Sequence, residues 1–238
     1  MTKSSPPPVE RAFTLIEILV VMAIIIGLAA IIIPSLNSAL ERAKVAKDLS
    51  NLRQIGAATQ MYMSDNNGVF PGSATVTWMS QLEQNQKYLS TWRVLQSPFD
   101  KRTTSELGNA TTAISYGINS NIYSGGVGIS ADKVTKPVTF VVLAPAQTSA
   151  STVSFQGAAS GVNSGAPQGV RVLGIGGNKA TSTPGGDATR GTHNNRTKIN
   201  AICADWHVET MLWSGTGPAF TNTSNPGNDP DAQFRWSP

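Results

Sequence analysis

The residues best suited to chemistry lie near the C-terminal end, where both histidines of the chain occur among several carboxylates. His193 precedes a run in which Asp205, His207 and Glu209 occupy alternate positions. If this run is one strand, its three side chains share a face and His193 joins them from the preceding loop, which gives donors for a transition metal. If Asp205 and Trp206 form a hairpin turn, that face is lost and the residues have structural roles. The flanking β-type runs favour the turn, although Trp206 is a poor residue where a positive φ is needed.

Other arrangements that could bind an ion or a substrate are weaker. The run Asn228-Asp229-Pro230-Asp231 offers oxygen ligands for calcium but has no bidentate acid nearby, so a solvated acidic turn is the default interpretation. The serine of segment 161–165 stands one place off a nucleophile elbow, and segment 174–179 lacks the spacing of a phosphate loop. Only two histidines are present for acid–base work. The sequence therefore predicts no enzymatic activity and no required cofactor.

The composition excludes several further classes of protein. Charged residues make up 13% of the 238 positions, about half the usual share, which excludes a long solvated coiled coil or a highly charged tail. The net charge of +4 is too small to specify nucleic acid without a clustered patch, so no specific nucleic-acid partner is expected. The single cysteine, Cys203, cannot form an intrachain disulfide. Stability must therefore come from packing.

A strongly apolar segment lies near the N-terminus. Residues 13–33 are apolar except at Thr14, Glu17 and Gly27. As a helix this segment is about 31 Å long, which matches the hydrocarbon core of a bilayer. Two alternatives are a cleaved secretory signal and a buried core helix, but the segment is longer than a secretory signal core and runs on into Pro34 without a small-x-small stop. The sequence therefore predicts one membrane-spanning helix.

The orientation of this helix follows from the charges that precede it. Lys3 and Arg11 favour a cytoplasmic N-terminus, which places residues 35–238 outside the inner membrane. Inside the apolar segment, Glu17 is the one ionisable residue, and a carboxylate in hydrocarbon costs several kcal/mol unless it is paired or reaches the interface. Glu17 therefore either extends to the lipid headgroups or pairs with a cation that its own helix does not supply.

The run Arg11-Ala12-Phe13-Thr14-Leu15-Ile16-Glu17-Ile18 resembles the processing site of type IV prepilins and of type II secretion pseudopilins. In that family a membrane peptidase removes a short basic leader before a phenylalanine, which is then N-methylated. The resemblance implies cleavage between Ala12 and Phe13, methylation at Phe13, and pairing of Glu17 with the Phe13 amino group of a neighbouring subunit. Ala12 stands where the family usually has glycine; alanine is the smallest change available, so processing is expected to survive.

The helix is expected to continue beyond the membrane segment. Gly27 and Pro34 weaken it, and Pro34 is expected to kink it or to free a carbonyl. In the family, a proline at the matching position marks where the helix melts during assembly; the simpler alternative is that Pro34 ends the membrane helix. Beyond it, an apolar face predicts an amphipathic helix that packs on a sheet, formed by Leu36, Leu40, Val45, Leu49, Leu52, Ile55 and Tyr62. Charged residues are expected off this face: Glu41, Arg42, Lys44, Lys47, Asp48 and Arg53.

The predicted organisation has four parts: a leader (1–12), a transmembrane or filament-core helix (13–34), an amphipathic helix (35–68) and an outer domain (69–238). In the outer domain a short helix is expected at 77–90, and β-branched runs predict strands at 114–119, 138–144, 170–175, 199–204 and 207–213. Long surface loops are expected at about 145–192. These elements predict an α+β fold in which an antiparallel sheet packs on the long helix, which is also the pilin architecture.

Three later fragments are similar to a large pseudopilin-like subgroup: Ser97-Pro98, residues 115–119 and residues 204–209. In that subgroup a histidine precedes an Asp-Gly-His run. Trp206 replaces the glycine here and the spacing from His193 is longer, which puts a shared local function in doubt.

Taken together, these features predict a filament subunit of a type II secretion pseudopilus or a type IV pilus. The resemblance implies other pilin-like subunits, the prepilin peptidase, an inner-membrane assembly platform and membrane lipid as partners. Glu17, Gly27 and Pro34 are its candidate assembly residues. Two alternatives remain open: a membrane-anchored protein that binds a ligand through the loops at 145–192, and an anchored metalloenzyme built on His193 and His207.

Overall fold

The structure is a computed structural model, and it describes most of the helical and sheet residues of the chain. The described residues are 14–73, 76–83, 87–103, 112–124, 127–146, 153, 155, 171–172, 191–213, 220–221, 231, 234–235 and 238. The chain forms two compact units, Met1–Ala43 and Lys44–Pro238. The predicted leader and most of the predicted loops at 145–192 lie outside the described residues.

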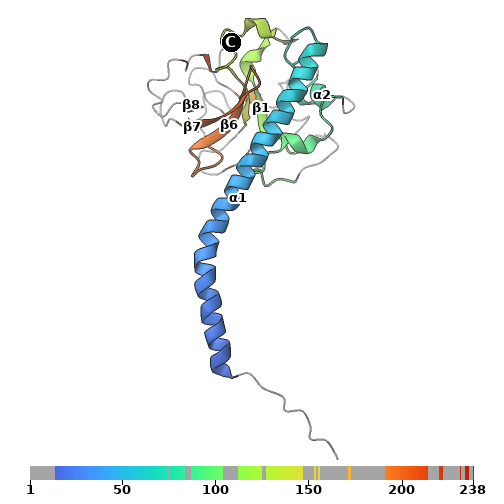
Figure 1. The fold of residues 1–238 in the computed structure, drawn as a ribbon. Coiled ribbons are helices and arrows are strands. Elements are labelled where there is room, and N and C mark those ends of the chain that lie inside the picture. The colour runs from blue at the N-terminus through green and yellow to red at the C-terminus, as the bar shows by residue number, and fades with distance from the viewer. Residues whose placement is uncertain are drawn as a thin grey trace, which may run out of the picture. The chain divides into compact units, whose positions relative to one another are not determined.

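Helix α1 (Leu15–Asp65) begins in the first unit and ends in the second (Figure 1). Gly27 and Pro34 both lie inside it, and the helical assignment continues through them. Proline removes one backbone donor and costs about 3 kcal/mol in a helix interior. From Leu15 to Leu40 the large apolar side chains are exposed. Within its own unit, the described part of α1 therefore leaves this apolar surface exposed.

The C-terminal end of α1 is capped by the backbone amides of Asn66 and Gly68. The Gly68 amide donates to the Met63 carbonyl at 2.8 Å, and the Asn66 amide donates to the same oxygen at 3.1 Å. Asn67 and Gly68 have φ angles of 55° and 73°, in the left-handed region that asparagine and glycine tolerate best. The chain can therefore turn sharply away from the helix axis at this point.

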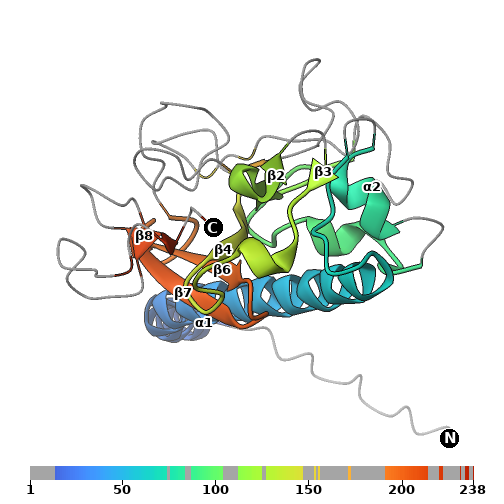
Figure 2. The ribbon, with the colours of Figure 1, turned by 90° about the horizontal axis from the view of Figure 1, so that it is seen from above.

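The second unit contains a six-stranded sheet in the order β5-β1-β4-β6-β7-β8. Its strands are β1 (Tyr116–Asn119), β4 (Val141–Pro145), β5 (Arg171–Val172), β6 (Lys198–Cys203), β7 (Val208–Trp213) and β8 (Phe220–Thr221). The four central strands β1, β4, β6 and β7 are antiparallel, and the short edge strand β5 pairs parallel with β1. Figure 2 shows the later part of α1 lying along one face of this sheet. The predicted α+β, pilin-like fold is confirmed, with the parallel edge strand as the difference.

Smaller elements cover the rest of the second unit. Helix α2 (Trp78–Glu83) is shorter than the predicted 77–90 helix, and the 3₁₀ helix η2 (Trp92–Leu95), capped by the Thr91 hydroxyl, follows it. Strands β2 (Tyr123–Ser124) and β3 (Val127–Gly128) form a separate hairpin. The 3₁₀ helices η3 (Ser120–Ile122) and η4 (Ala131–Lys133) flank it. Helices α2, η2 and η3 contribute buried side chains to the described core.

The helix packs closely on the sheet, but its buried face differs from the predicted one. Leu52 and Ile55 are fully buried, and a Cβ at Gly56 would overlap the Cδ1 atom of Ile202 on β6. Leu36 and Leu40, which the apolar pattern assigns to the same face, are 53% and 52% exposed. They precede the second unit, so its sheet does not bury them.

Candidate functional site

The first candidate site is the start of α1, where Glu17 folds back on Thr14. The Glu17 Oε2 atom accepts from the Thr14 amide at 2.8 Å and from the Thr14 hydroxyl at 2.7 Å, and the Thr14 hydroxyl accepts from the Glu17 amide at 3.3 Å. This is a capping box, which satisfies amides that a helix start leaves without partners. The Thr14-x-x-Glu17 spacing is the sequence signature of this motif, so the role of the carboxylate within its own helix was visible in the sequence although it was not predicted.

The other predicted assembly residues have no comparable contacts. A Cβ added at Gly27 would meet no atom within 4 Å, and Pro34 is exposed. Ala12 and Phe13, the predicted cleavage and methylation residues, lie outside the described part of the chain. Among the helices that the structure describes, α1 alone is long and apolar enough to cross a membrane by length and composition, and its apolar stretch is not buried. The chain therefore carries a helix that suits membrane anchorage.

The second candidate is a buried polar cluster around Asp48, which we call the Asp48 network. One carboxylate oxygen accepts from the Ser97 hydroxyl at 2.6 Å and from the Tyr116 hydroxyl at 2.5 Å, and the other accepts from the Asn200 side-chain amide at 2.8 Å. Thr210 donates to the Asn200 oxygen at 2.8 Å. The carboxylate of one α1 residue therefore joins the helix to the Ser97 loop, to β1 and to β6.

The chemistry of the Asp48 network is set by burial. Asp48, Ser97, Tyr116 and Asn200 are all nearly or fully buried. Desolvation raises the pKa of Asp48 above its usual range, although its three hydrogen bonds act in the opposite direction. The pKa of Tyr116 is raised well above its usual value by its own burial and by the Asp48 charge. Neither group is placed to exchange protons with a substrate, so the network is a structural link.

The expected position of Asp48 off the packed face is wrong, and a usable signal was present in the sequence. Asp48, Leu52, Ile55, Thr59 and Tyr62 recur at steps of four, three, four and three, which is the spacing of one helix face. The charge of Asp48 argued against burial. Two of the three fragments that resemble the pseudopilin-like subgroup, Ser97-Pro98 and residues 115–119, supply two of its hydrogen-bond donors. The segments that hold two of the hydrogen-bond donors were thus singled out from the sequence, but the burial of Asp48 was not predicted.

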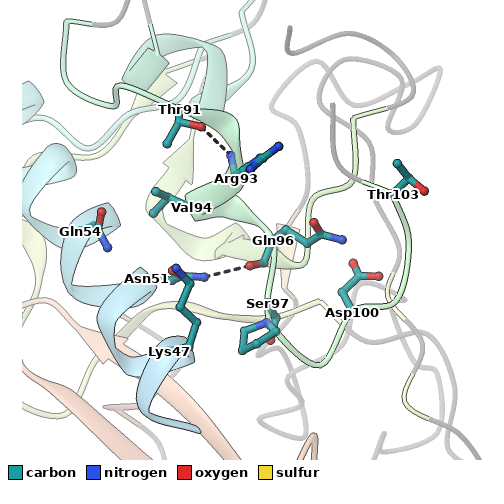
Figure 3. A pocket seen from close by; sticks show the side chains of 11 residues that line it. Lys47, Asn51, Gln54, Thr91, Arg93, Val94, Gln96, Ser97, Asp100 and Thr103 are labelled. Carbon is teal, nitrogen blue, oxygen red and sulfur yellow. Dashed lines mark hydrogen bonds between the residues drawn. The ribbon is translucent and has the colours of Figure 1, made fainter. Parts of the chain in front are cut away.

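A surface pocket of about 650 Å³ lies beside this network (Figure 3). Its wall joins Lys47, Asn51 and Gln54 of α1 to the segment from Thr91 to Thr103, and the Asn51 side chain donates to the Gln96 carbonyl at 2.9 Å. Lys47, Arg93 and Asp100 give the lining both signs of charge. Asp100 accepts from Arg102 at 2.6 Å. This mixture is typical of a hydrated surface and does not indicate one class of ligand.

The third candidate is the β6–β7 hairpin, where the turn interpretation is correct. The Trp206 amide donates to the Cys203 carbonyl at 2.9 Å and the Cys203 amide donates to the His207 carbonyl at 3.0 Å, which is a three-residue loop with a bulge. Trp206 has a φ of 71°, at the position where such loops favour glycine and where the similar subgroup has it. Its indole packs near Phe70, with ring centroids 6.3 Å apart. The ring is partly buried against the core, and this packing offsets the backbone strain.

The turn nevertheless keeps three of the predicted metal ligands together. Asp205 Oδ1 lies 2.5 Å from His207 Nδ1, and Glu209 Oε2 lies 3.9 Å from His207 Nε2. His193 lies elsewhere, because it forms a β-bridge with Lys198 at the other end of β6. A strand of this length separates Lys198 from Cys203 by about 17 Å. It stacks on Phe99 at 5.5 Å. The structure therefore does not bring His193 to the other three residues.

The remaining predicted ion site is only partly described. Asp231 pairs with Lys136 at 2.6 Å, and residues 228–230 lie outside the described residues. Sequence reasoning missed Cys203 and Arg235, which both contact Glu209: Cys203 Sγ lies 3.6 Å and Arg235 Nη1 lies 3.3 Å from its Oε1 atom. The sequence separation of Arg235 from Glu209 hides this contact. Cys203 is close in sequence, but its role was considered only for disulfides.

Comparison with known proteins gives a partial match. No family model matches the chain, and no solved structure matches it. It is 40% identical over 58 residues to type II secretion system core protein G of Pectobacterium carotovorum subsp. carotovorum, and 42% identical over 57 residues to the protein of that name from Pseudomonas aeruginosa. The chain is similar to type II secretion pseudopilins.

This similarity confirms the family resemblance that the N-terminal motif predicted, within clear bounds. Each match covers 24% of this chain, and the chain spans 37% and 40% of the length of the two relatives. The pseudopilin likeness and the pilin-like fold agree with each other. The activity and the partners of the whole protein do not follow from a match of this length.

Proposed function

We propose that this chain is a pilin-like structural subunit that assembles into a type II secretion pseudopilus or a related type IV pilus-like filament, without enzymatic activity of its own. One observation carries the proposal: the first part of α1 exposes its apolar side chains, contains the single acid Glu17, and continues into a folded α+β unit. A soluble protein cannot leave that much apolar surface in water, so the segment requires lipid or neighbouring helices. The similarity to core protein G favours the type II secretion machine.

Before assembly, the apolar part of α1 spans the inner membrane. Its N-terminus lies in the cytoplasm and residues 35–238 lie in the periplasm, as the positive charges of Lys3 and Arg11 favour. The prepilin peptidase removes residues 1–12 and Phe13 becomes the methylated N-terminus. The subunit is a substrate of that enzyme, and it enters the filament through an inner-membrane assembly platform. Gly27 and Pro34 are the positions where α1 adjusts during this transfer.

During assembly, Glu17 exchanges partners. In the single subunit its carboxylate accepts two hydrogen bonds from Thr14. In the filament it pairs with the Phe13 amino group of a neighbour, so that both charges leave water together. The Thr14 hydroxyl can still cap the Glu17 amide, because that bond uses the threonine as the acceptor. The exchange lowers the cost of moving the carboxylate from the free subunit into the filament core.

The mass of the mature N-terminal peptide tests the processing part of this proposal. Protein isolated from a host with the prepilin peptidase should yield a peptide that begins at Phe13 and carries one added methyl group. Protein from a host without the peptidase should begin with the leader and serves as the control. An unmodified leader in both hosts would overturn the proposal. An Ala12→Gly variant should be processed faster, because the family usually has glycine there.

A further inference from the structure

The β6–β7 hairpin holds a second set of donors that the filament proposal does not use. Cys203 Sγ, a ring nitrogen of His207 and a Glu209 carboxylate oxygen all lie within 4.8 Å of one another. Two ligands at ordinary Zn–S, Zn–N and Zn–O distances in tetrahedral geometry are about 3.3–3.7 Å apart. The Cys203 Sγ to Glu209 Oε1 distance of 3.6 Å already has this value, and His207 Nε2 lies 3.9 Å from Oε2. Small side-chain adjustments would close the set around one ion.

The orientation of His207 is already fixed in the sense that a metal needs. Asp205 Oδ1 lies 2.5 Å from His207 Nδ1 and also accepts from the His207 amide at 3.2 Å. A carboxylate at Nδ1 holds the proton there and leaves the Nε2 lone pair for a metal, which is the usual outer contact of zinc-binding histidines. The hairpin loop itself is held in place, because the Asp205 amide donates to the Pro137 carbonyl and the Ala204 amide to that of Phe140.

The set is accessible on one side and buried on the other. Cys203 is fully buried, while the side chain of His207 is 38% exposed. Arg235 pairs with Glu209 and neutralises part of its charge, so an ion would share this carboxylate with the guanidinium. A mixed sulfur, nitrogen and oxygen donor set suits zinc and disfavours calcium and magnesium, which take oxygen ligands.

We propose that Cys203, His207 and Glu209 bind one zinc-type transition-metal ion, that Asp205 orients His207, and that solvent fills the fourth position on the exposed side. The ion would clip β6 to β7 immediately beside the strained Trp206 turn. This inference is independent of the filament proposal, because none of the four residues lies on α1. It also replaces the donor set expected from the sequence, since Cys203 enters it and His193 leaves it.

Cobalt(II) provides a direct test on the full chain purified in detergent after treatment with a chelator. Adding Co²⁺ should produce visible d–d bands and a sulfur-to-cobalt charge-transfer band, and added Zn²⁺ should abolish both. Cys203→Ser should remove the charge-transfer band, and His207→Gln should weaken binding at least tenfold. Asp205→Asn should weaken binding by about 10- to 100-fold, as expected for a residue that orients a ligand.

His193→Gln is the matched control, because it removes the other histidine from the far end of β6; it should leave the spectrum and affinity unchanged. Circular dichroism of each variant separates loss of the site from loss of the fold. A wild-type protein without a charge-transfer band would overturn the proposal. So would a His207→Gln variant that is folded and binds Co²⁺ with wild-type affinity.

Discussion

Two acids on one helix, Glu17 and Asp48, show how differently the two parts of α1 are built. Glu17 lies among exposed apolar side chains, and within the described part of the chain it accepts hydrogen bonds from Thr14, at its own helix start. Asp48 is fully buried and is bonded by three side chains from three other segments. The first part of α1 therefore leaves its apolar side chains exposed, whereas the second part buries its side chains and satisfies its buried carboxylate within its own unit. Substitutions at matched positions should separate the two.

The largest effect is expected from Asp48→Ala. It removes the acceptor of three buried donors, and leaving these without partners should lower the free energy of unfolding by about 3–5 kcal/mol. Urea denaturation followed by circular dichroism measures this. Glu41→Ala, an exposed acid on the same helix, is the control and should stay within about 0.5 kcal/mol of the parent. Equal free energies of unfolding for the two variants would contradict a stabilising role for the hydrogen bonds of Asp48.

A pair of glycines sharpens the same comparison. Gly56→Ala places a methyl group against Ile202, so it should destabilise the second unit by about 1–3 kcal/mol. Gly27→Ala meets open space and should leave the free energy of unfolding of the second unit unchanged. Thermal denaturation of both variants in detergent is the measurement. If Gly27→Ala proved the more damaging of the two, the division of α1 would be wrong.

The raised pKa of Asp48 predicts the sign of a pH effect. Between the unfolded pKa near 3.8 and the higher folded pKa, the folded state binds more protons than the unfolded state. The stability that Asp48 contributes is therefore complete below the unfolded pKa and is lost as pH rises through the folded one. Urea titrations of the parent and of Asp48→Asn at a series of pH values from 4 upward isolate the contribution of Asp48 to the free energy of unfolding. If the free energy of unfolding of the parent instead increased relative to that of Asp48→Asn as the pH rose, the predicted sign would be wrong.

The smallest effect concerns the turn that packs near Gly56. Both Trp206→Ala and Trp206→Gly lose the indole, but glycine also relieves the positive φ. The glycine variant should therefore be more stable than the alanine variant by about 1 kcal/mol. Measuring both in one denaturant series cancels the loss of the ring. An alanine variant as stable as the glycine variant would show that the backbone at Trp206 is unstrained or relaxes.

Much of this fold could be predicted from the sequence because its signals are local. Every predicted strand overlaps an observed one, and the continuous apolar and amphipathic periods predicted α1. The exceptions depend on distant partners. Burial of Asp48 requires Tyr116 and Asn200, which lie 68 and 152 residues away. The parallel pairing of β5 with β1 likewise joins segments that no local pattern links.

The candidate sites divide in the same way. The proposed assembly role of Glu17 rests on one short motif, and its observed capping contact with Thr14 is also local. The metal donor set could not be completed from the sequence, because the period of a strand gave no reason to include Cys203 with His207 across a hairpin turn. Trp206 made that turn harder to predict, because it occupies the positive-φ position where glycine usually marks such a turn.

The central claim is that Glu17 exchanges Thr14 for the amino group of a neighbouring subunit, and filament assembly of Glu17→Gln tests it most directly. Sheared surface or pseudopilus fractions should lack this variant, while its mature N-terminus, its membrane insertion and the unfolding of its outer unit remain those of the parent. Glu41→Gln, assembled at the parental level, is the control. Filaments of Glu17→Gln that form in parental amounts would contradict the account.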